Sequence, residues 1–98
     1  MNSEEILARL VSFDTTSTKS NLELIDFVRN LLSDSGIASQ LLHNDDRTRA
    51  NLYATLGPDD IGGVMLSGHT DVVPAEEEGW RSDPFRLREE NDRLFARG

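Results

Sequence analysis

Apolar residues near the start of the chain recur at the spacing of a helix face. Four of them follow Ser3 at helical spacing, as two pairs four positions apart: Ile6, Leu7, Leu10 and Val11. Glu4 and Glu5 favour the positive end of a helix dipole, so the pattern predicts a short amphipathic helix with Ser3 as its N-cap. The next residues, Asp14–Ser20, are rich in hydroxyl groups that bond their own backbone, which predicts a loop.

A second helical pattern begins at the end of this loop. Ser20-Asn-Leu-Glu23 has the form of a capping box, in which the serine and the glutamate each satisfy a backbone N–H of the first turn. An apolar stripe follows it: Leu24, Ile25, Val28, Leu31 and Leu32. The stripe predicts a helix that ends with Gly36 at the C′ position.

Beyond Gly36 the period of the apolar positions changes from 3.6 to 2, which indicates strands. Alternation predicts half-buried strands over 37–42 and 51–56, separated by a polar connection. The short apolar run Gly63–Ser67 lies between turn formers, so it is expected to be a central strand covered on both faces. Near the end of the chain, Glu90–Arg93 is expected to turn a tight hairpin. Helices interspersed with such strands predict an α/β fold with a parallel or mixed sheet.

Composition excludes several classes of function. The 98 residues carry 18 acidic and 10 basic side chains and no cysteine, for a net charge of −8. An acidic chain is repelled by nucleic acid and by anionic membrane surfaces, so neither is an expected partner. Without cysteine there is no disulfide and no thiolate metal site. The chain has no apolar run long enough to span a membrane and begins with acidic residues, so a cytoplasmic location is expected.

The residues with the clearest chemical interest are His69 and Asp71, directly after the predicted central strand. Ligands of open α/β sheets bind at the carboxyl ends of strands. His69 and Asp71 are two residues apart, so in extended backbone their side chains point to the same side of the chain. One interpretation is that the imidazole binds a metal and the carboxylate supports it. The alternative is that His69 donates to a nearby carbonyl while Asp71 caps a turn before Pro74, and neither binds anything.

The wider sequence resembles a known family, the dinuclear metal-dependent amidohydrolases and peptidases called M20. This family includes acetylornithine deacetylases, succinyl-diaminopimelate desuccinylases, aminoacylases and carboxypeptidases. The deacetylases are the branch that the chain most resembles. Four segments carry the resemblance, in the family's order and spacing: Asn51–Gly57, Gly63–Pro74, Trp80 with Ser82–Phe85, and Leu94–Gly98.

The resemblance implies a fold, a reaction and two site residues. The fold is a three-layer α/β catalytic domain with a mixed sheet, of the zinc-peptidase type. The reaction is hydrolysis of N-acetyl-L-ornithine to ornithine and acetate in arginine biosynthesis; the alternative is the reaction of a related M20 hydrolase, such as a succinyl-diaminopimelate desuccinylase, an aminoacylase or a carboxypeptidase. His69 is implied to bind one of two divalent ions, zinc or cobalt, and Asp71 to be the active-site acid. A homodimer is compatible with the complete enzyme.

The resemblance also implies that residues 1–98 are only the N-terminal part of the catalytic domain, about the first quarter of such an enzyme. The aspartate that bridges both metals, the paired glutamates, the remaining ligands and the lid domain would lie beyond Gly98. We therefore expect the 98-residue chain alone to be inactive. The rival interpretation is a non-catalytic α/β remnant that binds a partner through an exposed sheet edge.

Three other groups of residues attract a functional interpretation that the sequence does not favour. Glu76–Glu78 is expected to be a solvated charge run and not the family's glutamate pair, because it lies at a different place in the chain. His43 stands alone at the end of a predicted strand and is expected to be a surface or turn residue. Thr15–Ser17 lacks a neighbouring base in the sequence, so a hydroxyl nucleophile is not expected there.

Overall fold

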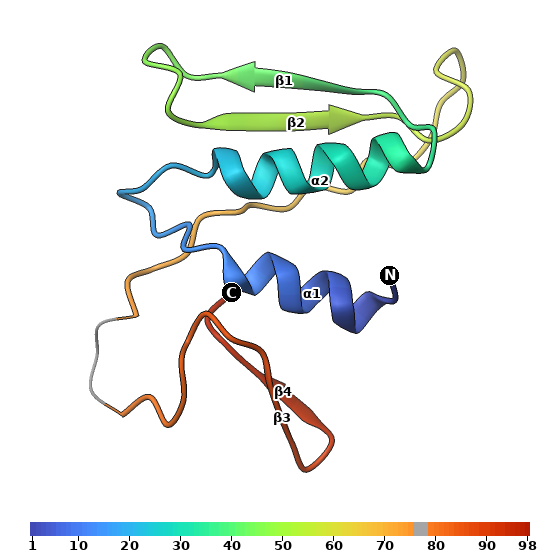
Figure 1. The fold of residues 1–98 in the computed structure, drawn as a ribbon. Helices are drawn as coiled ribbons and strands as arrows, with labels where there is room; N and C mark the ends of the chain where they lie inside the picture. The colour runs from blue at the N-terminus through green and yellow to red at the C-terminus, as the bar shows by residue number, and fades with distance from the viewer. Residues whose placement is uncertain (76–78) are drawn as a thin grey trace. The chain divides into compact units, whose positions relative to one another are not determined.

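The computed structural model describes residues 1–75 and 79–98, which form two compact units (Figure 1). One unit contains residues 1–19 and 70–98, and the other contains residues 20–69. The expected charge run Glu76–Glu78 lies outside the described residues. The elements in chain order are α1 (Ser3–Ser12), α2 (Leu22–Asp34), β1 (Ser39–His43), β2 (Ala50–Ala54), β3 (Arg88–Glu90) and β4 (Arg93–Phe95).

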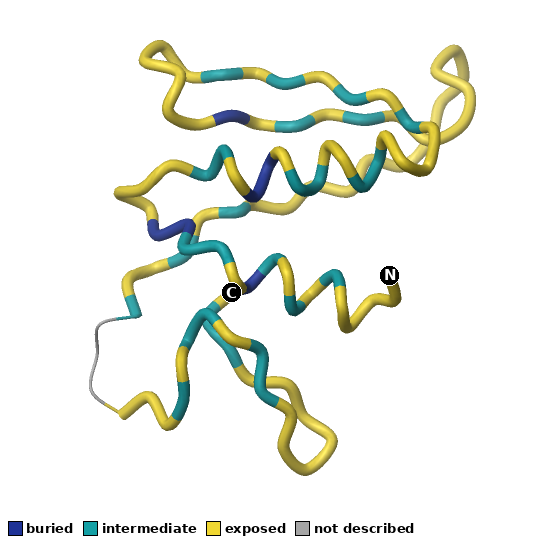
Figure 2. The backbone as a smooth tube through the Cα atoms, in the orientation of Figure 1, coloured by how far each residue is buried: buried dark blue, intermediate teal, exposed yellow. Residues whose placement is uncertain are grey.

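In the unit of residues 20–69, α2 packs against an antiparallel hairpin of β1 and β2 (Figure 1). The register places Leu41 opposite Leu52. Because side chains alternate along a strand, this pair is half-buried while the neighbouring Leu42 and Tyr53 are exposed. The predicted alternation is therefore confirmed for both strands. The buried apolar side chains of the unit are Leu24, Ile25 and Ala50 (Figure 2).

The start of α2 differs from the predicted capping box. Asn21 is the N-cap, and its side chain makes no capping hydrogen bond. The Asn21 amide instead pairs with the backbone of Ala50: its Nδ2 donates to the Ala50 carbonyl at 2.9 Å and its Oδ1 accepts from the Ala50 N–H at 3.0 Å. These two bonds satisfy the backbone of a buried residue at the beginning of β2, so a tertiary contact replaces the expected local cap.

The end of α2 is as predicted. Gly36 has a φ of 76°, the left-handed conformation that glycine adopts without steric cost. The Ile37 N–H donates to the Leu32 carbonyl and the Gly36 N–H to the Ser33 carbonyl, both at 2.9 Å. This pair of bonds is the Schellman motif, which satisfies carbonyls that the helix leaves open and redirects the chain into β1.

The predicted central strand over Gly63–Ser67 is wrong for this structure. The segment has no ladder partner, and in Figure 1 it is drawn without an arrow. The side chains of Val64 and Leu66 are 89% and 93% exposed. A strand that is apolar at consecutive positions needs cover on both faces, and no described strand pairs with it.

In the other unit, α1 begins one residue earlier than predicted. Asn2 is the N-cap and not Ser3: its Oδ1 accepts from the Glu5 N–H at 2.9 Å, while the Glu5 carboxylate accepts from the Asn2 N–H at 3.2 Å. Val11 is the buried residue of this helix. Gly98 lies beside it, since a Cβ on Gly98 would stand 3.5 Å from Val11 Cγ1.

The predicted hairpin near the end of the chain is confirmed as β3 and β4. Asn91 and Asp92 turn it with φ values of 53° and 58°, the conformation of a two-residue type I′ turn. The Arg88 guanidinium carbon stands 4.6 Å from the centre of the Phe95 ring on the opposite strand. This cation–π contact joins the two short strands through their side chains.

The described residues therefore form a small mixed α/β structure with two helices and short antiparallel strands. The expected single mixed sheet is not present in this part of the chain, where β1–β2 and β3–β4 are separate two-stranded sheets. None of the helices in the described residues has the length and apolar character that crossing a membrane requires.

Candidate functional site

His69 and Asp71 lie in extended backbone between Gly68 and Pro74, and both are exposed. The boundary between the two compact units falls between His69 and Thr70, so the two residues belong to different units. Their expected proximity stays a prediction. Apart from Gly68 and its two chain neighbours, no atom lies within 4 Å of where a Cβ on Gly68 would stand.

The segment that carries Asp71 pairs with the hydroxyl-rich loop after α1. The Ser17 N–H donates to the Val72 carbonyl at 3.0 Å, and the Val72 N–H donates to the Thr15 carbonyl at 3.1 Å. These bonds form a parallel bridge between Thr16 and Val72. Both bonds are made by Val72, so the backbone is fixed at the residue that directly follows the exposed Asp71.

Side chains of the same loop add two further bonds to this pairing. The Thr15 hydroxyl donates to the Thr70 carbonyl at 2.6 Å, and the Ser17 hydroxyl donates to Asp71 Oδ2 at 3.2 Å. Thr15 and Thr16 are only 5% and 7% exposed. Buried hydroxyl groups need partners, and the Thr15 hydroxyl finds its partner in a segment 55 positions away in the sequence.

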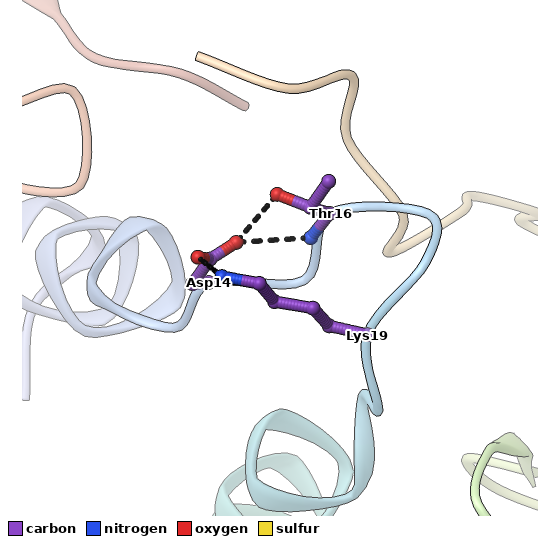
Figure 3. Close-up of polar contacts among 3 residues, drawn as sticks. All are labelled: Asp14, Thr16 and Lys19. Atoms are coloured by element: carbon purple, nitrogen blue, oxygen red, sulfur yellow. Dashed lines mark hydrogen bonds and ion pairs between the residues drawn. The ribbon is translucent and has the colours of Figure 1, made fainter. Parts of the chain in front are cut away.

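The loop keeps its shape through the Asp14 carboxylate (Figure 3). One carboxylate oxygen accepts from the N–H and the hydroxyl of Thr16, at 3.2 and 2.5 Å. The other oxygen pairs with the Lys19 ammonium group, and the Lys19 N–H donates to the Thr16 carbonyl at 2.7 Å. The hydrogen bond from Lys19 and then those from Thr16 lower the pKa of Asp14 from 3.8 to about 2.

This arrangement predicts how the loop responds to pH. A carboxylate whose pKa is depressed by folding stabilises the folded loop above pH 3.8, and this contribution is lost as the pH falls towards 2. Lys19→Ala removes the largest cause of the depression, so the midpoint of the Asp14 titration should rise towards 3.8. The measurement is the pH dependence of the Asp14 carboxyl carbon signal by NMR. Lys19→Arg keeps the charge and serves as the control; an unchanged midpoint in Lys19→Ala would contradict the assignment.

Arg97 contacts the part of the chain that follows Asp71. The Arg97 Nη2 donates to the Pro74 carbonyl at 3.2 Å, and its guanidinium carbon stands 5.1 Å from the centre of the Trp80 ring. The Arg97 N–H donates to the Pro84 carbonyl at 2.7 Å. Arg97 therefore ties together three of the segments in which the family resemblance was found.

The described residues do not build a complete metal site. They contain no group of three or more histidine, cysteine, aspartate or glutamate side chains that could share an ion. A zinc site takes three or four protein ligands. His69 would therefore contribute one imidazole to such a site. The other histidine, His43, is half-buried at the end of β1.

Two surface depressions occur at other places in the structure. One, of about 580 Å³, is lined by Trp80 and by residues of the β3–β4 hairpin. The other, of about 540 Å³, lies at the open end of the β1–β2 hairpin, where β1 begins and β2 ends. Neither is lined by His69 or Asp71. His69 and Asp71 are therefore exposed residues that line neither of these two depressions.

Sequence reasoning identified the hydroxyl-rich loop but missed its partner. Thr15 and Ser17 were discounted as nucleophiles, and the structure instead makes them hydrogen-bond donors to the segment of Thr70, Asp71 and Val72. The density of hydroxyl groups was the available signal. It indicates many polar contacts without saying with which distant segment they are made.

Comparisons with known proteins agree with the resemblance. Residues 65–98 match the model of peptidase family M20/M25/M40. The chain is 38% identical over 88 residues to an acetylornithine deacetylase of Pasteurella multocida, covering 89% of this chain and 23% of that protein. It is 40% identical over 86 residues to the acetylornithine deacetylase of Edwardsiella ictaluri, covering 87% and 22%. The chain thus spans about a quarter of the length of these relatives.

Proposed function

We propose that the whole protein is a member of peptidase family M20/M25/M40 and a metal-dependent hydrolase of amide bonds in N-acyl amino acids. The match over residues 65–98 carries the proposal, because it includes both His69 and Asp71. The names of the relatives support a finer proposal, hydrolysis of N-acetyl-L-ornithine to ornithine and acetate as a step in arginine biosynthesis.

Within this proposal the two residues have different roles. His69 offers an imidazole, a ligand type suited to zinc or cobalt, and the residue is exposed in this chain. Asp71 offers a carboxylate that supports the site from beside it. A pair of divalent ions would supply the polarisation of the amide carbonyl and the activation of a water molecule. The remaining ligands would come from outside these 98 residues, as the length of the relatives suggests.

We also propose that Gly63–Ser67 becomes a strand of a three-layer α/β domain in the whole protein. The support is the exposure of Val64 and Leu66, which is unusual for two large apolar side chains so close together. Pairing with further strands, and cover by further helices, would remove this apolar surface from water.

The experiment that tests the proposed function is a substrate panel on the whole protein. N-acetyl-L-ornithine should be hydrolysed with a higher kcat/KM than N-succinyl-diaminopimelate or other N-acetyl amino acids. A preference for one of these others would keep the family's reaction and overturn the finer substrate assignment. Absence of hydrolysis for all of them would overturn the proposed function.

The 98-residue chain alone is the matched negative control for this panel. Because its described residues hold no cluster of three metal-binding side chains, it should release no ornithine above background. Chelator-sensitive release by this short chain would contradict the assignment of the missing ligands to other parts of the whole protein.

A further inference from the structure

The Ser17 side chain makes direct contact with the carboxylate of Asp71. The Ser17 hydroxyl donates to Asp71 Oδ2 at 3.2 Å, across 54 positions of sequence. Ser17 lies outside the stretch 65–98 that matches the family model, so neither that match nor a local motif assigns it a role. Its hydroxyl also reaches the Val72 carbonyl at 3.3 Å, so the same group contacts both the carboxylate and the backbone that carries it.

We propose that Ser17 is a positioning residue for Asp71 in the reaction of the whole protein. This inference rests on the proposed function and deepens it. An exposed carboxylate turns freely about its side-chain torsions, and a hydrogen bond to one of its oxygens selects one orientation. Asp71 is exposed, so burial does not fix the orientation of its carboxylate, and the hydrogen bond from Ser17 restrains Oδ2 directly.

The loop of Ser17 is built to hold that hydroxyl in place. The backbone of Ser17 donates to the Val72 carbonyl at 3.0 Å, which fixes the loop against the segment of Asp71 at the same residue. On the other side, Asp14 ties down Thr16 and Lys19, the residues on either flank (Figure 3). A donor on a constrained backbone loses less conformational entropy when it binds than a donor on a mobile one.

Two other serines in the chain make local bonds instead of a long-range contact. The Ser12 hydroxyl donates to the Arg9 carbonyl three residues earlier, and the Ser20 hydroxyl accepts from the Leu22 N–H two residues later. These bonds are local and serve turns or helix ends. The bond from Ser17 is long-range and ends on the carboxylate proposed to take part in catalysis.

The kinetic test is a double-mutant cycle in the whole enzyme. Ser17→Ala should lower kcat about 10- to 100-fold, the usual cost of removing a group that orients an active-site residue, while KM stays close to that of the parent. Ser17→Thr keeps a hydroxyl at the same position and should restore most of the rate. In an Asp71→Asn background, Ser17→Ala should cost little more, because both changes act on the same group.

Ser12→Ala is the matched control, since it removes a hydroxyl of the same unit that makes only a local bond. It should leave kcat at the parental value. Parental kcat in Ser17→Ala, or an equal loss of rate from Ser17→Ala with and without Asp71→Asn, would overturn the positioning role.

A second readout separates this inference from the proposed function. NMR three-bond couplings of Asp71 in the 98-residue chain should report the same dominant χ1 rotamer in the parent and in Ser17→Thr, and a lower population of that rotamer in Ser17→Ala. If the whole protein hydrolyses no N-acyl amino acid, the proposed function fails, and the couplings still decide whether Ser17 orients Asp71. Identical couplings in the parent and in Ser17→Ala would overturn the inference whatever the activity.

Discussion

Replacing His69 with alanine is expected to remove metal and turnover together from the whole enzyme. The substitution deletes the imidazole proposed as a metal ligand and leaves no donor atom in its place. A site with three or four protein ligands loses much of its affinity when one ligand is removed. The loss of activity should therefore exceed the roughly 10- to 100-fold cost typical of residues that only orient a ligand. Metal content by elemental analysis and kcat/KM for N-acetyl-L-ornithine are the two measurements.

The matched control is His43→Ala, which removes the other of the two histidines in this chain. His43 lies at the end of β1 and belongs to no metal-binding group among the described residues. This variant should keep the parental metal content and rate, provided circular dichroism shows that it is folded. A folded His69→Ala enzyme with full metal and full rate would remove His69 from the site.

Asp71→Asn should fail in a different way, with metal largely retained and turnover lost. Asparagine keeps the shape of the side chain, and its carbonyl oxygen can still accept the hydrogen bond that Ser17 donates to Asp71. What is lost is the negative charge that supports the reaction. We expect kcat to fall by about 100-fold or more, since neutralising a charge that acts on the reacting groups commonly costs this much.

Asp60→Asn makes the same change at an exposed residue outside the stretch 65–98 that matches the family model, and it should have the parental rate. The comparison of metal content with rate decides between the two roles. If Asp71→Asn lost metal to the same extent as His69→Ala, Asp71 would be a metal ligand and not a supporting acid. If it turned over substrate at the parental rate, it would have no role in the chemistry.

Local patterns in the sequence predicted the elements whose determinants are local. The end of α2 at Gly36 and the hairpin around Asn91 and Asp92 depend on backbone conformations that few residue types adopt, so the sequence indicates them directly. The alternation that predicted β1 and β2 is likewise a local signal. The start of α2 was less predictable, because Asn21 serves a contact with Ala50 that no local pattern reveals.

The segment Gly63–Ser67 shows why a correct local pattern can still give a wrong element. Its apolar run is typical of a buried central strand, and a strand exists only where a neighbour offers a hydrogen-bonding edge. In the described residues no such edge is paired with it, and Val64 and Leu66 remain exposed. The apolar pattern therefore indicates that the segment requires a paired neighbour and cover on both faces, which the proposed three-layer domain would provide.

The candidate site was predictable in its residue types and not in its surroundings. His69 and Asp71 are conspicuous because imidazole and carboxylate groups next to a glycine and a strand-like run are typical of strand-end sites. The contribution of Thr15 and Ser17 depends on pairing with residues some 55 positions away, and no periodicity in either segment encodes that pairing. Long-range polar contacts of this kind require the three-dimensional arrangement.

The proposal that the whole protein is a metal-dependent hydrolase is tested most directly by removing its metal and then returning it. The protein is treated with a chelator, the chelator is removed, and ornithine release from N-acetyl-L-ornithine is measured before and after zinc or cobalt is returned. We predict that the activity of the parent disappears with the metal and returns with it, while His69→Ala stays inactive at the same metal concentration. Full activity in the metal-free parent, or full recovery of His69→Ala, would contradict it.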